Sequence, residues 1–500
     1  MSGTPPTGSA GSYPFTVSVT DGQQTASKQF DLLVQSGGSG TSLKADFEAS
    51  PTQGTAPLTV NFTDKSTGSP TSWEWDFDND GTVDSTQQNP THTYNDPGWY
   101  TVKLTVSDGT SSDICVKEKY VLVASGIYCV DGVGGNDANS GLDWSNAWKT
   151  IGKALSVAGD YDLVLVADAT YNETDLNFNG KKIYLKGVDH NNAGQQPVID
   201  CQQAGRAFYF GSGETGDCVI DNFTIQNGKV SGTSGGAVLC ESNSSPTIKN
   251  CVFKDNETES GMWTASGGAI ACWDSSDATI SGCTFIGNRT VWYGGAIFWH
   301  SSDPTVTNCI FKFNNAFHGA AIGCWESTAS IINCIFDSNG ATNCGGAITC
   351  SSSSPTLTNC TFSGNGATNF YGGAISCNFS SPTLNNCILW DDIAGSSGNE
   401  IYIKDPGSSC TLNYCCVDNT GYGGQTGNIT ENNCIHVDPQ FVDVLTGDYH
   451  LKDTSPCIDA GDNSLVPSSV TTDLDGRKRI VDGDNDGSAT VDIGAYEYQP

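Results

Sequence analysis

Small and apolar residues recur in a fixed order between residues 235 and 390, where one pattern is written six times. Each copy follows Gly-Gly-Ala-Ile-x-Cys, a Ser-rich turn, Pro-Thr-Ile-x-Asn-Cys-x-Phe and a loop that ends near an Asn. The copies begin at Gly235, Gly267, Gly294, Gly319, Gly345 and Gly372, so their spacings are 32, 27, 25, 26 and 27 residues. A unit this short cannot bury a core alone, so the copies are predicted to stack as a solenoid.

Each copy predicts two short strands. In Gly-Gly-Ala-Ile-x-Cys, the period of two places the second Gly, the apolar residue and the Cys on one face. In the second strand, Ile248, Cys251 and Phe253 share a face only if the chain bends at Asn250, a residue type that favours such a bend. The same Asn recurs at Asn308, Asn333, Asn359 and Asn386. Stacking in register at about 4.8 Å turns each position into a column of like residues.

Cysteines occupy two of these interior columns. The chain contains 21 cysteines, an odd number, so at least one is unpaired or pairs between chains. Buried thiols that pack as small apolar groups are favoured over disulfides along a column. Neighbouring rungs present parallel Cα–Cβ bonds, a geometry that suits a disulfide poorly.

The first part of the chain predicts smaller β units. Residues 12–34 alternate around an Asp-Gly turn and predict a hairpin, so residues 1–35 are interpreted as a partial Ig-like segment. Residues 36–42 form a Gly/Ser linker. Residues 43–125 contain strand-like runs spaced for a small β-sandwich.

Three phrases of this sandwich carry a family resemblance. Trp73-Glu-Trp-Asp-Phe-Asp78, Asn89-Pro-Thr-His-Thr-Tyr94 and the run from Pro97 to Asp108 resemble the PKD domain. That resemblance implies a spacer or interaction module of an extracellular protein, with no catalysis of its own.

The remaining residues are divided into three parts. Residues 127–160 predict an N-terminal helical cap, with a helix that starts near Asp143 and has Ser145 as its N-cap. Residues 161–437 are assigned to the parallel solenoid. Residues 438–500 lose the repeat and are expected to cap its far end, with an acidic loop.

The repeats and the tail resemble the right-handed parallel β-helix proteins of bacterial surfaces. The tail phrases that carry the resemblance include Ser455-Pro-Cys-Ile-Asp-Ala-Gly461 and Val491-Asp-Ile-Gly-Ala-Tyr-Glu-Tyr498. Relatives of those proteins include pectate-lyase-like enzymes and polymorphic outer-membrane repeats. The resemblance implies an all-β chain with a right-handed parallel β-helix, but no activity, because this coil serves lyases, hydrolases, epimerases and adhesins alike.

Charge and hydropathy limit the classes of binding partner that the chain can have. With 22 basic and 55 acidic side chains, the net charge is -33, which argues against a nucleic-acid partner because phosphates require a basic face. The sequence has no apolar run long enough to predict membrane insertion. We expect an extracellular or bacterial cell-surface protein whose export signal and anchor lie outside these residues.

Two acidic loops are candidate calcium sites. Asp76, Asp78, Asp80, Gly81 and Asp84 follow the order of an EF-type loop at positions 1, 3, 5, 6 and 9, although Gln87 stands where that loop needs Glu. The second loop repeats the start of the pattern with Asp482, Asp484, Asp486, Gly487 and Asp492. Solvated acidic turns are the alternative interpretation of both loops.

Aromatic residues flank the first strand of the repeat and predict a ligand-binding face. Stacking would align two aromatic bands beside a strip of small residues, which suits a sugar chain because rings stack on pyranose faces. The candidate ligand-binding residues are Trp263, Trp273, Trp292, Tyr293, Phe317, Trp325 and Tyr371. The alternative is that these rings pack over turns and shield the edges of the rungs.

Recognition or structural display at a surface, with a polysaccharide or cell-surface glycan as partner, is the first functional expectation. The second is a polysaccharide lyase or glycoside hydrolase on the same face, with catalytic candidates Glu241, Asp274, His300 and Glu326. Arg289 is the nearest basic residue and lies in a turn, which counts against a lyase. The third is a filament or surface-layer subunit that self-associates or binds other surface proteins.

Overall fold

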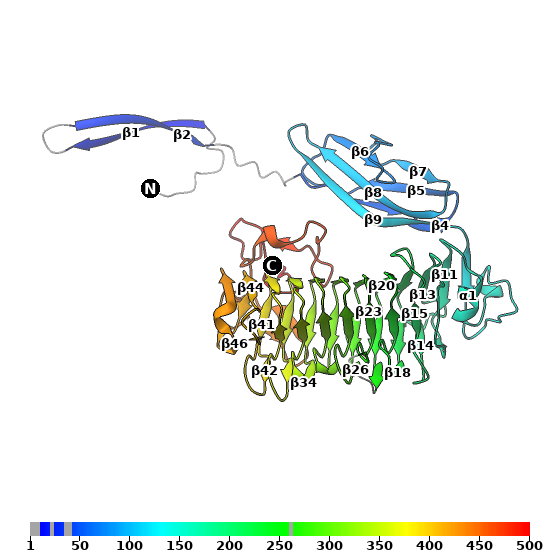
Figure 1. Ribbon diagram of the computed structural model, residues 1–500. Helices are drawn as coiled ribbons and strands as arrows, with labels where there is room; N and C mark the ends of the chain where they lie inside the picture. The colour runs from blue at the N-terminus through cyan, green and yellow to red at the C-terminus, as the bar shows by residue number, and fades with distance from the viewer. Residues whose placement is uncertain (1–10, 21–24, 35–42, 260–263) are drawn as a thin grey trace. The chain divides into compact units, whose positions relative to one another are not determined.

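The computed structural model describes residues 11–20, 25–34, 43–259 and 264–500 (Figure 1). The chain divides into two compact units, Met1–Gln53 with Pro57–Leu122 and Gly54–Ala56 with Val123–Pro500. At its start, β1 (Gly11–Thr20) pairs antiparallel with β2 (Thr25–Val34), so the predicted hairpin is present. The predicted linker, residues 36–42, lies outside the described residues.

A small antiparallel sandwich follows. One sheet has the order β3 (Phe47–Ser50), β5 (Leu58–Asp64), β7 (Thr91–Tyr94), and the other β4 (Gln53–Thr55), β9 (Ser112–Ala124), β8 (Gly98–Ser107), β6 (Ser72–Asp76). In β5, Leu58, Val60 and Phe62 are buried between exposed threonine and asparagine, as the period of two requires. The rings of Phe47 and Phe62 pack on Trp75, whose indole N–H donates to the Gln87 carbonyl at 2.8 Å.

A parallel β-helix occupies residues 127–432, and its described strands form four sheets of twelve, ten, nine and seven strands. The twelve-stranded sheet contains β10 (Ile127–Val130), β11 (Leu163–Ala167), β13 (Tyr184–Val188), β16 (Val219–Asp221), β20 (Thr247–Lys249), β24 (Thr279–Ser281), β28 (Thr305–Thr307), β32 (Ser330–Ile332), β36 (Thr356–Thr358), β40 (Thr383–Asn385), β44 (Cys410–Asn413) and β47 (Ile429–Asn432). The ten-stranded sheet contains β12 (Thr170–Tyr171), β14 (Val198–Asp200), β17 (Thr224–Gln226), β21 (Val252–Lys254), β25 (Thr284–Ile286), β29 (Ile310–Lys312), β33 (Ile335–Asp337), β37 (Thr361–Ser363), β41 (Ile388–Trp390) and β45 (Cys416–Val417).

The nine-stranded sheet contains β15 (Phe208–Phe210), β19 (Val238–Cys240), β23 (Ile270–Trp273), β27 (Ile297–His300), β31 (Ile322–Trp325), β35 (Ile348–Ser351), β39 (Ile375–Asn378), β43 (Ile401–Ile403) and β46 (Tyr422–Gly424). The seven-stranded sheet contains β18 (Lys229–Ser231), β22 (Glu257–Glu259), β26 (Arg289–Thr290), β30 (Asn315–His318), β34 (Gly340–Cys344), β38 (Gly366–Ala367) and β42 (Ile393–Ala394). The predicted solenoid is thus confirmed, and its rungs pair in parallel and in register.

The bend at Asn250 is also confirmed. Asn250 has φ of 54°, and the equivalent asparagines have φ between 50° and 53°. This left-handed conformation, which Asn tolerates, turns the chain so that Ile248 and Phe253 both face the core. After each bend the Cys thiol donates to the carbonyl two residues earlier, for example from Cys309 to Thr307 at 3.2 Å. A cysteine at this position therefore fills the column and also pairs a carbonyl at the bend.

All 21 cysteines lie in the described residues, and each is a free thiol in this structure. One column runs through Cys240, Cys272, Cys324, Cys350 and Cys377, with Trp299 in its third rung. The second cysteine column contains Cys251, Cys283, Cys309, Cys334, Cys360 and Cys387. Beside it, the rings of Phe253, Phe285, Phe311, Phe336 and Phe362 stack with centroid separations of 4.4–5.0 Å and interplanar angles of 2–6°. Columns of identical side chains thus pack as well along the axis as across the core.

The glycines that open each copy, two in five copies and one in the fourth, where Ala320 takes the second place, lie before the strand and not within it as the period of two predicted. Strand β23 begins at Ile270, while Gly267 has φ of 72°. A Cβ on Gly268 would lie 2.1 Å from the carbonyl oxygen of Gly295 in the next rung. In the five copies with a double glycine, the second glycine therefore lies in a tight turn where the next rung is too close for a side chain, whereas the fourth copy accommodates Ala320.

Buried polar side chains form a second repeated contact between rungs. One set forms an asparagine ladder, which consists of Asn256, Asn288, Asn314, Asn339 and Asn365. From Asn288 onward, each side-chain oxygen accepts hydrogen bonds from the backbone and side-chain amides of the preceding asparagine. Each side-chain amide also donates to a phenylalanine or isoleucine carbonyl, as Asn339 does to Phe311 at 2.9 Å. The ladder ends at Asp392, whose carboxylate accepts from Asn365 at 2.6 and 2.8 Å.

The helix at the N-terminal end is shorter than predicted. Asp143 caps a 3-10 turn, η1 (Trp144–Asn146), and Ala147 is extended, so Ser145 does not cap the helix. Helix α1 (Ile151–Val157) begins after Thr150, whose side chain accepts from the Lys153 amide. The cause is Asp137, whose carboxylate accepts from the amides of Lys149 and Thr150 and holds them outside the helix. Strand β10 of the predicted cap region belongs to the twelve-stranded sheet.

Further 3-10 turns are η2 (Asn419–Gly421), η3 (Thr426–Asn428) and η4 (Asn463–Leu465). The C-terminal segment, residues 438–500, also contains β48 (Phe441–Asp443) paired with β49 (Asp448–Leu451), and β50 (Ile480–Val481) paired with β51 (Thr490–Val491).

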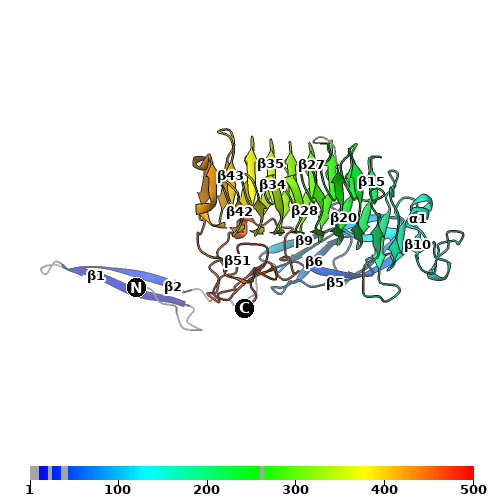
Figure 2. The same ribbon diagram turned by 90° about the horizontal axis from the view of Figure 1, so that it is seen from below.

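We predicted that this C-terminal segment closes the far end of the solenoid, but it folds back along the ten-stranded sheet (Figures 1 and 2). The outward residues Ile335 and Ile388 of that sheet are buried against Phe441, Tyr449 and Ile493, among others. Exposure of this apolar column to water would be unfavourable, and the C-terminal segment removes it from water.

Polar contacts fix the same arrangement. The Tyr449 hydroxyl donates to Asp337 at 2.8 Å, and the Ala495 amide donates to the Thr361 hydroxyl at 3.0 Å. His450 lies between the carboxylates of Asp448 and Asp475, at 2.6 and 2.9 Å.

Replacing Asn339 by Ala should lower the free energy of unfolding by about 2–4 kcal/mol, because it removes the partner of the Phe311 carbonyl, of the Asn314 backbone N–H and of one side-chain N–H of Asn314. Urea unfolding measures the change. The control is Asn315→Ala, which removes an exposed asparagine next to the ladder that makes one hydrogen bond to Gly340. Equal effects of the two substitutions would contradict a structural role for the ladder.

Candidate functional site

The outward surface of the nine-stranded sheet is built from one residue per rung. The residue between the two core residues of each strand points outward, and the register aligns Tyr209, Leu239, Ala271, Phe298, Gly323, Thr349, Ser376 and Tyr402. The final strand residues align as Trp273, His300, Trp325, Ser351 and Asn378. The predicted alignment of Trp273 with His300 and Trp325 is therefore present in the structure.

Six rings form a continuous cluster, which we call the aromatic face: Trp273, Phe298, His300 and Trp325 on the nine-stranded sheet, His318 at the end of β30, and Tyr293 in the segment before β27. Their ring centroids are separated by 5.3 Å for Trp273–Phe298, 4.9 Å for Trp273–His300, 5.9 Å for His300–Trp325, 6.0 Å for Tyr293–Phe298, 5.6 Å for Tyr293–Trp325 and 4.8 Å for Tyr293–His318. The two predicted bands are thus joined through Phe298 and the Tyr293–Trp325 contact.

A missing side chain lets these rings meet. A Cβ at Gly323 would lie 2.9 Å from the Cβ of Tyr293 and 3.2 Å from the ring of Phe298. Tyr293 can therefore pack against Phe298 and Trp325 only because residue 323 is glycine. Phe298 was not among the predicted ligand-binding residues, although the copy Gly-Gly-Ala-Ile-Phe-Trp does replace the usual small residue by Phe.

Burial sets the charge of one member of the aromatic face. His318 stacks on Tyr293 with an interplanar angle of 18°. Its surroundings disfavour the imidazolium, and burial, with a contribution from Lys404, lowers the pKa of His318 to about 4. The ring is therefore neutral near pH 7 and extends the apolar surface of Tyr293.

The other predicted aromatic residues lie beside or beyond the face. Trp292 makes an edge contact with Phe317 at 5.7 Å, and Phe317 contacts His318 at 4.7 Å. Tyr371 lies three rungs from Tyr293 and stacks on Tyr402 at 4.1 Å. Trp263 lies outside the described residues.

Three of the four catalytic candidates lie at the edge of the aromatic face. Asp274 and Glu326 each follow a tryptophan in the bend after their strand, with φ of 52°, and both are exposed. They occupy equivalent positions two rungs apart, so their backbones are separated by about 9.5 Å. His300 ends the strand between them, and Ser301 donates to Glu326 at 3.2 Å.

The other two charged residues named from the sequence are elsewhere. Glu241 follows the strand one rung before Trp273 and accepts from the Tyr209 hydroxyl at 2.6 Å. Arg289 lies on the seven-stranded sheet, where it forms an ion pair with Glu257 at 2.6 Å. The structure thus holds Arg289 in that ion pair and places Glu241 in a different neighbourhood, next to Arg206 and Asp175.

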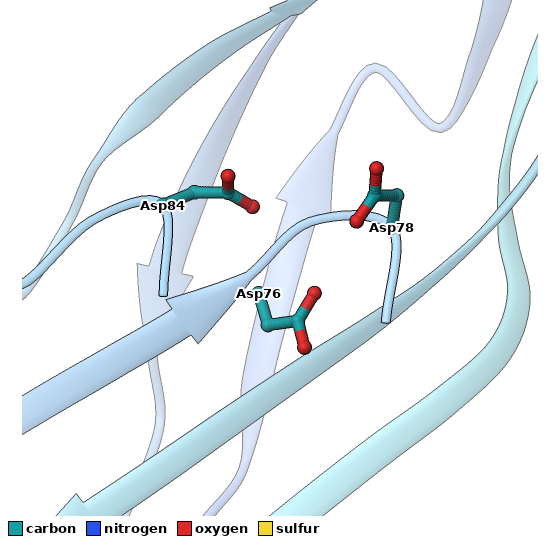
Figure 3. Close-up of side chains that lie close together, drawn as sticks. All are labelled: Asp76, Asp78 and Asp84. Carbon is teal, nitrogen blue, oxygen red and sulfur yellow. The ribbon is translucent and has the colours of Figure 1, made fainter. Parts of the chain in front are cut away.

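In the first acidic loop, the structure brings three of the four predicted aspartates together (Figure 3). One carboxylate oxygen from each of Asp76, Asp78 and Asp84 lies within 4.8 Å of the others. Asp80 is not in the group, and its amide donates to Asp76 and Asp78 at 3.1 and 3.3 Å. Burial, together with the charges of Asp80, Asp84 and Asp76, raises the pKa of Asp78. Converging oxygens of like charge are donors that fit a hard cation such as Ca²⁺.

In the second loop, Asp482 and Asp484 converge with Asp459, which the sequence analysis did not identify. Asp459 accepts from the Asp484 amide at 2.7 Å, a contact that only the folding of the C-terminal segment creates. Asp486 is outside the group, and its amide donates to Asp482 at 3.1 Å. Asp492 is buried and accepts from the Asp459 amide at 2.8 Å, and burial raises its pKa to about 6.

Two family models match the chain. The model for the PKD domain matches residues 43–123, and the model for the right handed beta helix region matches residues 182–355. The chain therefore combines a PKD domain with a right-handed parallel β-helix, as the sequence phrases suggested. No curated protein matches the chain.

Solved structures with a similar fold include pectate lyase Pel9A, at 13% identity and a TM-score of 0.45, covering 75% of this chain and 97% of that one. A rhamnogalacturonan lyase has 13% identity and a TM-score of 0.34, covering 64% and 91%. The family 28 exopolygalacturonase of Yersinia enterocolitica has 10% identity and a TM-score of 0.27, covering 76% and 91%. Likeness at this level assigns no activity to the chain. Among the described residues, no helix is long and apolar enough to span a membrane.

Calcium binding at the two loops remains a prediction. Adding Ca²⁺ should raise the melting temperature and release heat in calorimetry, since the ion relieves the repulsion between converging carboxylates. Asp78→Asn should remove the response of the first loop, and Asp484→Asn that of the second. Asp80→Asn is the control, because Asp80 lies outside the three-carboxylate group. Absence of a calcium response in the unsubstituted chain would contradict both sites.

Proposed function

We propose that this protein recognises carbohydrate at a cell surface, and that the aromatic face of its β-helix holds the sugar chain. The observation that carries the proposal is the continuous cluster from Trp273 to Trp325, in which five half-buried rings pack around the buried ring of Phe298. Rings on successive rungs present a broad apolar surface, and pyranose rings have apolar faces of matching size. Asp274, Glu326 and Ser301 at its edge offer acceptors for sugar hydroxyls, with the Ser301 O–H directed at Glu326.

The supporting framework is rigid. Trp273, Phe298, His300 and Trp325 stand on strands that are paired in parallel on both sides, and Tyr293 is bridged to His318, so their backbones are fixed within the stack. A binding surface that is already formed loses little conformational entropy when the ligand binds. The alternative is that outward apolar side chains only shield the edges of the rungs. That role suits the outward column of the ten-stranded sheet better than the aromatic face. That column is covered by the C-terminal segment, whose described contacts fall on the ten- and twelve-stranded sheets.

Polysaccharide cleavage is the second candidate function, and one observation favours it. Asp274 and Glu326 stand at equivalent positions two rungs apart, with backbones about 9.5 Å apart, and their exposed side chains can rotate to bring the carboxyl groups to the roughly 6.5–9.5 Å that inverting glycosidases use. His300 lies on the rung between them. A hydrolytic site there would use one carboxyl group to protonate the leaving oxygen and the other to activate water.

Replacing Trp325 by Ala should weaken binding on a glycan array about tenfold or more, because it removes a ring that contacts both Tyr293 and His300. Trp273→Ala should act in the same direction. The matched control is Phe313→Ala, which removes a ring that is 60% exposed but lies away from the nine-stranded sheet. Binding that is unchanged in both tryptophan variants would rule out the aromatic face as the site.

Incubation with plant and marine polysaccharides tests the second candidate. If Asp274 and Glu326 form a hydrolytic pair, new reducing ends should accumulate, and Asp274→Asn and Glu326→Gln should each abolish them. Unsaturated products would instead indicate a lyase. Absence of both products, with glycan binding retained, would leave recognition as the function.

A further inference from the structure

A pocket of about 350 Å³ opens on the same sheet, near its N-terminal end. It is lined by Asp175, Arg206, Tyr209, Thr233, Leu239 and Glu241. Tyr209 and Leu239 belong to the outward column that continues, through Ala271, to Phe298 of the aromatic face. Tyr209 is three rungs from Phe298, a separation of about 14 Å. The pocket and the aromatic face therefore lie along one line on the surface.

Arg206 is the unusual member of this pocket. Its side chain is 8% exposed, yet the guanidinium makes one hydrogen bond within the described part of the chain, to the Thr233 hydroxyl at 3.4 Å. No carboxylate of the described residues lies within ion-pair distance of it, although Asp175 and Glu241 are close enough to interact through their charges. A guanidinium carries five N–H donors. Most of these donors are therefore free to bind a molecule in the pocket.

The acceptors of the pocket are held in place. Glu241 is oriented by the Tyr209 hydroxyl, which donates to one of its oxygens at 2.6 Å. The Asp175 amide donates to the Arg206 carbonyl at 2.8 Å, which fixes the two backbones side by side. The carboxylates of Asp175 and Glu241 thus flank a guanidinium rich in unused donors. The exposed lining of the pocket is mainly polar, because Leu239 is buried, and the half-buried Tyr209 supplies a ring at its wall.

Charge decides the class of ligand. The pocket holds two carboxylates and one guanidinium in a chain of net charge -33, so an anion that approached Arg206 would also meet Asp175 and Glu241. A cation would meet Arg206. A neutral polyol avoids both repulsions, because each hydroxyl can accept from the guanidinium and donate to a carboxylate. Two adjacent hydroxyls on a ring match the planar fork of an arginine.

We propose that this pocket binds one neutral pyranose of a glycan, with adjacent hydroxyls bonded to Arg206 and Glu241 and one face of the sugar against the ring of Tyr209. The inference rests on the proposed carbohydrate recognition and adds a sugar class and a second contact region to it. Arg206 and Glu241 then select a neutral sugar, while the aromatic face holds other parts of the chain with little selectivity.

Ligand-observed NMR on the full chain tests the pocket. The probes are methyl glycosides of neutral pyranoses, with methyl glycosides of uronic acids as the anionic comparison. A neutral glycoside should bind, and both Arg206→Gln and Glu241→Gln should weaken it about tenfold or more, since each removes hydrogen bonds to a charged group. The matched control is Arg289→Gln, which removes an arginine already paired with Glu257 outside the pocket. Melting curves establish whether each variant is folded. If Arg206→Gln does not fold, Glu241→Gln still tests the pocket.

The outcomes separate the pocket from the aromatic face. Loss of neutral-glycoside binding in Arg206→Gln or Glu241→Gln, with binding retained in Trp325→Ala, supports the pocket whatever the glycan array shows for the tryptophans. Tighter binding of uronic acids, binding unaffected by both pocket substitutions, or no binding of any neutral glycoside would each overturn the inference. None of these three results contradicts glycan binding at Trp273 and Trp325, which the array tests separately.

Discussion

The parallel, in-register pairing of successive rungs is the constraint on which the β-helix depends. Each rung contributes few residues to the core, so its stability comes from the rungs above and below. In-register pairing also means that a residue type repeated in sequence becomes a column in space. Cysteine, phenylalanine and asparagine serve this fold because each can contact copies of itself at the rung spacing, as the stacked rings from Phe253 to Phe362 do.

The same constraint separates structure from recognition. Residues that repeat in every copy face the core or form the bends, and substituting them affects stability. The outward residues of the nine-stranded sheet differ between copies and give it its character, whereas the core columns vary little, with Trp299 as an exception. Phe298 and Trp325 occupy positions where other copies carry small or polar residues, such as Thr349 and Ser351. Because neighbouring rungs support the strands, these positions can vary without loss of the fold.

Much of the fold could be predicted from the sequence because a repeat reports contacts between rungs through local spacing. The Asn250 bend and the alignment of Trp273 with Trp325 followed from periodicity alone. The double glycine was misplaced because its role is steric, set by the carbonyl of the next rung, for example Gly295 against Gly268. The start of the helix was misplaced because Asp137, outside its pattern, holds the amides before it.

The candidate sites were predicted less completely. Asp459 joins Asp482 only through the fold of the C-terminal segment, and no local pattern links them. Arg206 and Asp175 lie in early rungs that precede the regular repeats, so periodicity did not align them with Glu241. Side chains brought together by irregular rungs leave no spacing signal in a single sequence.

The C-terminal segment has a consequence for the order in which the molecule is completed. It crosses several rungs at once, with Tyr449 bonded to Asp337 and Ala495 to Thr361. During synthesis, the outward column that includes Ile335 and Ile388 therefore stays uncovered until the last residues have been made. Without the segment, single rungs could open independently of one another. Once the segment has docked, it joins several rungs, so the last stage of folding makes their unfolding cooperative.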